Sequence, residues 1–159
     1  MLLLALAGTA IAGDPREHVA RVVDGDSVDL IGGAKVRLVQ IDAPELGVGE
    51  CYSLPAAVAL RRLLPRGVAV GLEADPLLEQ VDKHGRVLRY AWRGKMNLNI
   101  ELVREGAATV WLFRGQRGRY ADRLLAAART ARAEQKGMWG ACSTVWNPYG
   151  PATTHPRKP

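Results

Sequence analysis

Alternation of apolar and polar residues predicts five short strands along the chain. The first three lie at residues 18–23, 27–31 and 35–41, and two more lie at residues 68–73 and 87–92. Gly25 and the Gly32–Gly33 pair mark the turns between the first three strands. Within the third strand Val36 and Leu38 share one face, so Arg37 points away from Leu38.

Apolar residues at helical spacing predict three helices. They lie at residues 53–64, between Gly94 and Gly106, and at residues 119–136, with a short extended segment at residues 108–113 before the last. Ser53 is the expected N-cap of the first helix, with Pro55 in its first turn and Pro65 just past its end. Gly106 and Gly137 end the other two helices.

The order of these elements predicts an α+β fold that is mainly a β barrel. Five short strands with one helix between the third and the fourth are typical of a small five-stranded Greek-key barrel, here with three α-helices in all. Such barrels commonly present a nucleic-acid-binding face, but the function has to be argued from the site.

The two ends of the chain differ from this central domain, residues 13–142. An apolar run at residues 1–7 and the small-x-small pattern Ala10-Ile11-Ala12 predict a signal peptide at residues 1–12, with an ordinary N-terminal strand as the alternative. The run is too short for a transmembrane helix, so the mature protein is expected to make no membrane contact. Residues 143–159 contain four prolines and no apolar periodicity, which predicts a disordered tail.

Length and charge narrow the class of protein further. A chain of 159 residues with 48% hydrophobic and 24% charged residues describes one globular domain. The formal charge of +6 and the pI near 9.7 favour a polyanionic partner such as nucleic acid, the alternative being a basic protein without one. Arginine dominates the basic residues, with 17 Arg against 5 Lys, and arginine is the better bidentate ligand for phosphate.

The chain has two cysteines, Cys51 before the first predicted helix and Cys142 just past the last. In an oxidising compartment they are expected to form a disulfide, which would stabilise the fold by about 4 kcal/mol in the chain-entropy model. The alternative is two free buried thiols. No Cys-x-x-Cys pair or histidine-rich spacing in the sequence supports a zinc site.

Three short clusters combine acids with arginines. They are Asp24-Gly25-Asp26-Ser27, Arg37 followed by Asp42-Ala43-Pro44-Glu45, and Asp82-Lys83-His84-Gly85-Arg86. Carboxylates gather a hard divalent cation, and guanidinium groups neutralise phosphate oxygens as negative charge builds on them. The combination is typical of a site that cuts phosphodiesters.

In their order and spacing, these clusters and the segment Asn99-Ile100-Glu101-Leu102-Val103-Arg104-Glu105-Gly106-Ala107 resemble the staphylococcal nuclease (thermonuclease) family. The resemblance covers roughly residues 18–140 and implies an OB-fold barrel. It also implies that Asp26 and Asp42 bind a catalytic Ca²⁺ together with the backbone carbonyl of Ala43, where the family usually has Thr. Asp24 would then support these ligands without binding the metal itself.

The resemblance assigns the remaining catalytic roles as well. Glu45 would activate or orient the attacking water, and Arg37 and Arg86 would contact the scissile phosphate. Lys83 would reach a neighbouring phosphate, and His84 stands where the family commonly has Tyr. Asp82 is expected to be a turn residue that presents Arg86.

The base-binding edge departs from the family pattern. Leu112 and Arg114 occupy positions where the best-known member places tyrosines around the bound base. Trp111 or Arg114 are alternatives for holding a base, although core packing is the favoured reading for Trp111.

Together these features predict a secreted, monomeric, calcium-dependent endonuclease that hydrolyses DNA and RNA with little sequence specificity. By resemblance it would leave 3′-phosphate ends. The alternatives are a barrel of the same family that has lost catalysis and binds nucleic acid or a protein partner, and an exported structural domain with a basic surface. Degenerate domains of this kind typically lose the acids or the arginines, and this chain keeps both.

Overall fold

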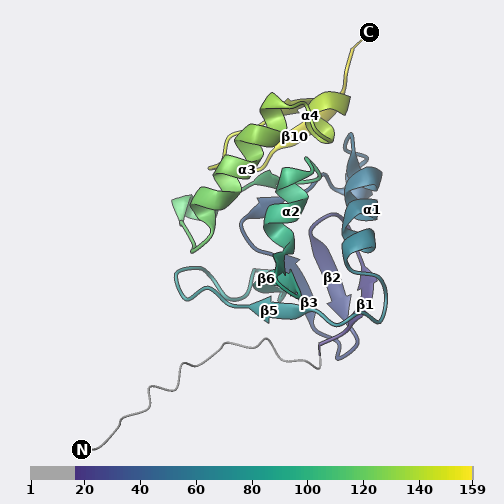
Figure 1. Ribbon diagram of the computed structural model, residues 1–159, viewed down its shortest axis with the longest axis vertical. Helices are drawn as coiled ribbons and strands as arrows, with labels where there is room; N and C mark the ends of the chain where they lie inside the picture. The colour runs from purple at the N-terminus through teal and green to yellow at the C-terminus, as the bar shows by residue number, and fades with distance from the viewer. Residues whose placement is uncertain (1–16, 159) are drawn as a thin grey trace, which may run out of the picture.

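The strands of the computed structural model form a curled sheet at one end of the molecule (Figure 1). The structure describes residues 17–158, so the predicted signal peptide at residues 1–12 lies outside the described residues. The order in the sheet is β1 (Val19–Val22), β2 (Ser27–Leu30), β3 (Lys35–Leu38), β6 (Val87–Arg93) and β5 (Gly71–Glu73), and β7 (Met96–Asn97) also pairs with β6. β3 and β6 run parallel, whereas the other pairs are antiparallel.

The sheet curls back on itself next to β1. An antiparallel bridge joins His18 to Ala69, and the Val19 N–H donates to the Val68 carbonyl at 3.0 Å, which ties β1 to the segment that leads into β5. The curled, barrel-like sheet with three main helices confirms the predicted α+β class. The predicted strand at 68–73 is shorter than expected, because regular pairing starts only at Gly71.

The predicted strand at 35–41 is interrupted before the second acidic cluster. Gln40 has a φ of 62°, a left-handed conformation that ends β3 and redirects the chain. Its buried side chain is held at both ends: the amide donates to the Gln116 carbonyl at 3.0 Å, and its oxygen accepts from the Tyr90 hydroxyl at 2.7 Å. The chain then forms β4 (Ile41–Asp42), which pairs with β8 (Thr109–Val110) in a separate two-stranded sheet.

The helices cover the sheet and continue away from it (Figure 1). They are α1 (Ser53–Leu63), α2 (Leu98–Arg104), α3 (Ala121–Ala133) and the single-turn α4 (Met138–Ala141), with 3₁₀ turns η1 (Leu46–Val48) and η2 (Phe113–Gly115). Ser53 is the first residue of α1 and not its N-cap, which is Tyr52. The Asn97 side chain caps α2 by accepting from the Ile100 N–H at 3.1 Å. Across residues 17–158, no helix has the length and apolar character needed to span a bilayer.

The main hydrophobic core lies between the sheet and the helices. The inward residues of β2 and β3 pack with the buried faces of α1, α2 and α3, and the fully buried members include Val36, Leu38, Leu60, Leu102 and Leu124. A second, smaller cluster around Met138, Trp139 and Cys142 anchors the C-terminal part of the chain. The two clusters therefore fix the barrel and the C-terminal segment separately.

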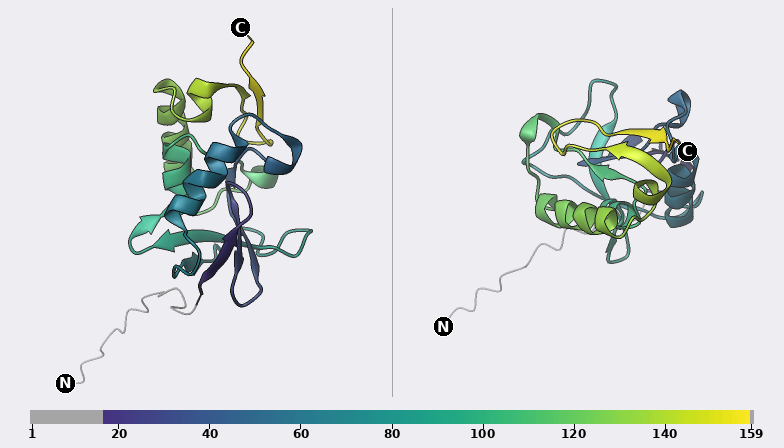
Figure 2. Two further views of the ribbon diagram at one scale, coloured as in Figure 1. Left: turned by 90° about the vertical axis from the view of Figure 1, so that its right-hand side faces the viewer. Right: turned by 90° about the horizontal axis from the view of Figure 1, so that it is seen from above.

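The C-terminal segment differs from the prediction of a disordered tail at residues 143–159. It forms β9 (Cys142–Val145) and β10 (Thr153–Pro156), an antiparallel hairpin at the end of the molecule away from the barrel (Figure 2). The hairpin is held by tertiary contacts, which local periodicity does not reveal. Among them, the Trp146 indole donates to the Val110 carbonyl at 2.8 Å and the Leu112 N–H donates to the Pro148 carbonyl at 2.6 Å.

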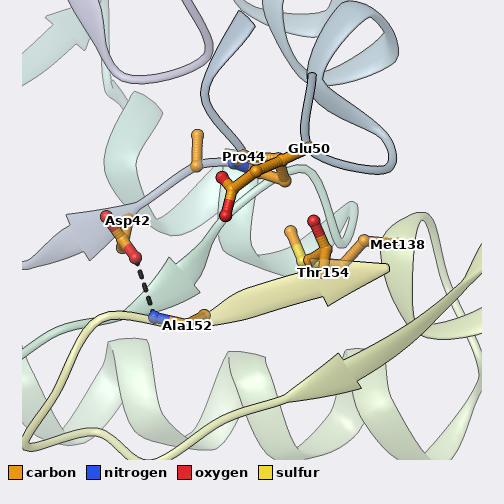
Figure 3. Close-up of a pocket in the computed structure, with 7 residues that line it drawn as sticks. Asp42, Pro44, Glu50, Met138, Ala152 and Thr154 are labelled. Carbon is orange, nitrogen blue, oxygen red and sulfur yellow. Dashed lines mark hydrogen bonds between the residues drawn. The ribbon is translucent and has the colours of Figure 1, made fainter. Parts of the chain in front are cut away.

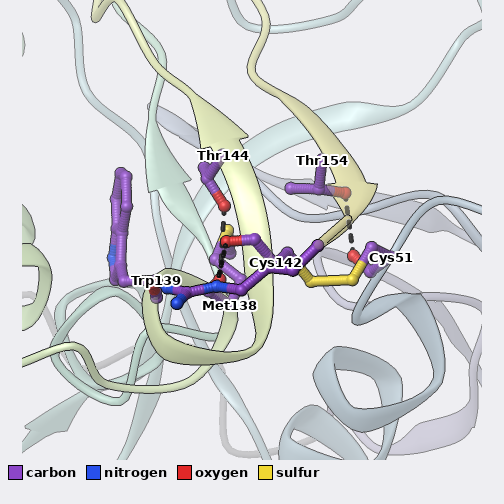
Figure 4. Close-up of a disulfide and its surroundings, with 7 residues drawn as sticks. Cys51, Met138, Trp139, Cys142, Thr144 and Thr154 are labelled. Carbon is purple, nitrogen blue, oxygen red and sulfur yellow. Dashed lines mark hydrogen bonds between the residues drawn. A yellow bond between two sulfur atoms is a disulfide. The ribbon is translucent and has the colours of Figure 1, made fainter. Parts of the chain in front are cut away.

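The predicted disulfide between Cys51 and Cys142 is present, with the two Cα atoms 6.1 Å apart. It joins the residue where β9 begins to the segment just before α1 (Figure 4). The bridge therefore attaches the C-terminal hairpin to the loop that follows the second acidic cluster.

Candidate active site

Strand register and one glycine bring the acidic clusters together. Ser27 pairs with Arg37 across β2 and β3, so the first cluster lies beside the start of the second. A Cβ on Gly25 would lie 2.6 Å from the Ala43 Cβ and 2.9 Å from the Ala56 Cβ. Only glycine permits this approach, which presses the Asp24–Asp26 turn against the second cluster and α1.

Arg37 lies between the two acids predicted to bind metal. Its Nη2 is 3.1 Å from Asp26 Oδ2 and 3.2 Å from Asp42 Oδ1, and its Nη1 donates to the Ile41 carbonyl at 2.9 Å. The side chain is only 13% exposed. Burial acts to lower the pKa of Arg37, but Asp26 and Asp42 outweigh it and raise the pKa, so the guanidinium stays charged.

A backbone N–H also fixes each of these two carboxylates. The Ala43 N–H donates to Asp26 Oδ2 at 3.0 Å, and the Ala152 N–H donates to Asp42 Oδ2 at 2.9 Å (Figure 3). Each acid therefore has one contact to Arg37 and one to a backbone donor. Two contacts of this kind hold a carboxylate in one orientation.

Arg86 joins the same network from the third cluster. The Asp82 carboxylate accepts from the Arg86 backbone N–H at 3.0 Å and from its Nε at 2.7 Å, as expected of a residue that presents Arg86. Arg86 Nη1 then donates to Ser27 Oγ at 3.3 Å, and that hydroxyl donates to Asp26 Oδ1 at 2.8 Å. Burial acts to raise the pKa of Asp82, but hydrogen bonds from Arg86 and His84 outweigh it and lower the pKa.

The site has an excess of negative charge. Burial, with the nearby charge of Asp26, raises the pKa of Asp24 to about 6. Burial and Asp26 likewise raise the pKa of Asp42 to about 6, even though Arg37 opposes the change. A carboxylate with a raised pKa is protonated more easily because its charged form is unfavourable. An additional cation next to it would stabilise that charged form.

The chemistry of these donors fits a calcium ion. Asp26 and Asp42 are hard, anionic oxygen donors that approach the same nitrogen of Arg37, and the Ala43 carbonyl belongs to the residue that already contacts Asp26. Within residues 17–158, no three His, Cys, Asp or Glu side chains are grouped closely enough to hold a metal by themselves. A bound calcium would therefore take several ligands from water or substrate, which is ordinary for this ion.

Three other residues that were predicted to belong to the site are exposed to solvent. Glu45 is the last residue of the second cluster. Within residues 17–158 its carboxylate makes no hydrogen bond or ion pair, while its backbone N–H donates to Glu50 Oε2 at 2.7 Å. Lys83 and His84 lie exposed in the turn between Asp82 and Arg86. These three side chains are free to meet a substrate that binds over the network.

Two contributors were missed from the sequence, Glu50 and the Ala152 N–H. Both line an open hollow with about 160 Å³ of empty space, together with Asp42, Ala43, Pro44, Met138 and Thr154 (Figure 3). The charge of Glu50 adds to the rise in the pKa of Asp42. The hollow is open and too shallow to enclose a ligand, so it forms a wall of the site and no nucleotide pocket. The one indication of Glu50 in the sequence was its position next to Cys51, which was predicted to form the disulfide.

The residues predicted to form a base-binding edge differ in their exposure. Leu112 is fully buried under the C-terminal segment, and Arg114 is exposed and pairs with Glu79 at 2.9 Å. Trp111, for which core packing was favoured, is only partly buried: its ring lies 5.6 Å from the Arg37 guanidinium carbon and 5.5 Å from the Phe113 ring, edge to face. The aromatic surface next to Arg37 is thus formed by Trp111 and Phe113.

Comparison with known proteins identifies the family. Residues 35–141 match the family model described as staphylococcal nuclease homologue. The chain is 30% identical over 140 residues to the thermonuclease of Staphylococcus hyicus, covering 84% of this chain and 80% of that protein. It is 32% identical over 127 residues to the thermonuclease of Staphylococcus intermedius (76% and 74% covered) and 30% identical over 139 residues to a micrococcal nuclease of Shigella flexneri (79% and 74% covered). The chain belongs to the staphylococcal nuclease family.

Proposed function

We propose that this protein is a secreted, calcium-dependent endonuclease that cleaves DNA and RNA with little sequence specificity and leaves 3′-phosphate ends. Membership of the nuclease family makes it a phosphodiester hydrolase. The main support for metal-dependent cleavage at this site is one network of contacts. In it, Arg37 joins Asp26 to Asp42, and Ser27 joins Asp26 to Arg86. The network connects two carboxylates and two guanidinium groups, which supports their proposed roles as metal ligands and phosphate-binding groups.

Asp26, Asp42 and the Ala43 carbonyl are the proposed calcium ligands, with Asp24 behind them. The Asp26 backbone N–H donates to Asp24 Oδ1 at 3.1 Å, so Asp24 orients the turn that presents Asp26. When bound, calcium supplies positive charge to a phosphate oxygen and lowers the pKa of coordinated water. Phosphate binding and proton transfer are proposed to be carried out by side chains of the protein.

Arg37 and Arg86 are proposed to bind the non-bridging oxygens of the scissile phosphate. Fixed guanidinium donors stabilise the charge that develops as water attacks phosphorus in line with the leaving group. Glu45 accepts the proton of the attacking water, and its exposed position at the end of the second cluster allows this contact. The bond from phosphorus to the 5′-oxygen breaks, that oxygen takes a proton from solvent water and leaves as a hydroxyl, and Glu45 returns the proton it accepted to solvent.

Low sequence specificity follows from the kind of contacts proposed. Arginine and metal contacts to phosphate carry no direct base information. Lys83 and His84 lie exposed beside Arg86, where they can reach a neighbouring phosphate or sugar. Trp111 and Phe113 offer a sequence-tolerant surface for stacking a base.

Secretion is supported by the disulfide, since such bonds persist in oxidising compartments. The predicted signal peptide supports the same location. The protein is proposed to act as a monomer.

Cleavage assays with purified protein test the proposal. Plasmid DNA and RNA should be degraded with calcium and remain intact with a chelator, and equal degradation in both would refute calcium dependence. Glu45→Ala should lower the rate by about 100-fold or more while DNA binding persists. Glu134→Ala, which changes an exposed glutamate at the end of α3, is the matched control and should cleave as the wild type does.

A further inference from the structure

Each of the two proposed calcium ligands contacts Arg37 and a backbone N–H, but these backbone donors come from different parts of the chain. Asp26 accepts from the Ala43 N–H at 3.0 Å, and Ala43 lies within the segment that matches the family model. Asp42 accepts from the Ala152 N–H at 2.9 Å, and Ala152 lies beyond that segment, which ends at residue 141. A carboxylate at the centre of the site is thus oriented by the C-terminal hairpin.

On one side, the hairpin is fixed to Cys51 by the disulfide and by two hydrogen bonds. The Thr154 hydroxyl donates to the Cys51 carbonyl at 2.8 Å, and the Cys51 N–H donates to the Thr154 carbonyl at 3.4 Å (Figure 4). Thr154 is buried, with 4% of its surface exposed, and it lies two residues after Ala152. Cys142 in β9 pairs with Pro156, the last residue of β10. The disulfide therefore fixes β9 at the point that lies opposite the C-terminal end of β10.

On the other side, the connection between β9 and β10 is tied to the strand next to Asp42. Trp146 donates to the Val110 carbonyl, and Pro148 accepts from the Leu112 N–H. Val110 belongs to β8, whose other residue, Thr109, pairs with Asp42. The Ala152 N–H is therefore positioned from both ends of the connection.

We propose that Ala152 is a positioning residue: its backbone N–H, held by the hairpin at residues 142–156 and the Cys51–Cys142 disulfide, orients the Asp42 carboxylate for divalent cation binding. The inference rests on the proposed function of Asp42. A carboxylate offers about four lone-pair sites, so contacts from Ala152 and Arg37 fix its orientation and leave other sites for a cation. Partners that orient a metal ligand in this way typically change metal affinity or activity by about 10- to 100-fold.

Cys142 allows the N–H to be removed without changing any side chain. Residues 1–141 can be made as a thioester and ligated to a synthetic peptide of residues 142–159, since native ligation needs a cysteine at the junction. In the test peptide, lactic acid replaces Ala152, so an ester takes the place of the amide between Pro151 and Ala152. The matched control is the same ligation with the ordinary all-amide peptide, and both proteins are oxidised to form the disulfide.

Calcium affinity is then measured by titration calorimetry in the absence of substrate. The ester protein should bind calcium about 10-fold or more weakly than the amide control, and its cleavage of plasmid DNA should recover at high calcium. Equal affinity would overturn the role of Ala152 and leave the proposed nuclease function standing. An amide control that neither binds calcium nor cleaves DNA would overturn both.

A second measurement separates an effect on Asp42 from a general effect on folding. Unfolding by urea in a chelator is compared for the amide and ester proteins, each with and without Asp42→Ala. The loss of stability caused by the ester should shrink when Asp42 is absent, because the acceptor is gone. An undiminished loss would show that the N–H acts through the fold alone, which also overturns the inference.

Discussion

The close approach at Gly25 makes a quantitative prediction for Gly25→Ala. The new methyl group would lie 2.6 Å from the Ala43 Cβ and 2.9 Å from the Ala56 Cβ, and both neighbours are short, buried side chains that cannot rotate away. Overpacking of this kind typically destabilises a protein by 1–3 kcal/mol. Because two contacts are violated at once, we expect a loss of about 3 kcal/mol in the free energy of unfolding.

The loss should be measured by urea unfolding in a chelator, with tryptophan fluorescence as the probe. Gly32→Ala is the matched control, since no heavy atom lies within 4 Å of the position where its Cβ would be. In the double variant Gly25→Ala with Ala43→Gly, the closest contact disappears, so part of the lost stability should return. A Gly25→Ala protein within 0.5 kcal/mol of the wild type, on the order of the effect of an ordinary surface substitution, would refute the steric argument.

Calcium binding should respond to the same substitution. Gly25 lies between Asp24 and Asp26, and the Ala43 that it contacts also donates its N–H to Asp26. Any shift that relieves the clash moves this donor and acceptor apart, so calcium affinity should fall together with stability. Unchanged calcium affinity in a destabilised variant would show that the turn moves as a rigid unit.

Three further predictions follow from the site and the disulfide. Arg37→Lys should lower the cleavage rate at saturating calcium by about 100-fold or more, since lysine lacks the planar fork that contacts both acids through Nη2 and the Ile41 carbonyl through Nη1; wild-type turnover would refute this. Replacing Cys51 and Cys142 by serine should lower the free energy of unfolding by about 4 kcal/mol, measured in urea, because the bond closes a 91-residue separation; an unchanged midpoint would contradict it. Burial and the charge of Asp26 raise the pKa of Asp42 from 3.8 to about 6, so the folded state binds this proton more tightly than the unfolded state does. In calcium-free protein, the contribution of Asp42 to the free energy of unfolding should be greatest below pH 4 and should fall by up to about 3 kcal/mol as the pH rises through 6, measured in urea as the difference between wild type and Asp42→Asn. A pH profile identical to that of Asp42→Asn would exclude this source.

Local patterns predicted the barrel and its helices well, because each main element carries its own signal. Alternation in β2 and β3 and apolar spacing in α1 and α3 reflect the burial of one face, which the structure shows directly. Boundaries were less accurate where tertiary contacts decide them. The strand at 35–41 stops at Gln40, whose left-handed backbone is supported by contacts to Tyr90 and Gln116 far along the chain.

The candidate site was predictable in its side chains and unpredictable in its backbone donors. Acids and arginines at recognisable spacing identified Asp26, Arg37 and Asp42, which the structure brings into contact. Every residue type except proline can supply a backbone N–H, so nothing in the sequence marked Ala152. The same reason explains the wrong prediction for the tail. Its order comes from a disulfide and single hydrogen bonds to β8 and Cys51, and none of these produces an apolar period.

The position of Ala152 after all the other site residues in the sequence has a consequence for the timing of activity. A ribosome makes every other residue of the site before the donor to Asp42 exists, and oxidation must follow before the hairpin is covalently secured. If the hairpin acts as proposed and the protein is secreted as proposed, synthesis and oxidation together delay full activity until the enzyme has left the reducing compartment that holds the cell's own nucleic acids. Reduced enzyme should then degrade DNA more slowly than oxidised enzyme at the same limiting calcium concentration.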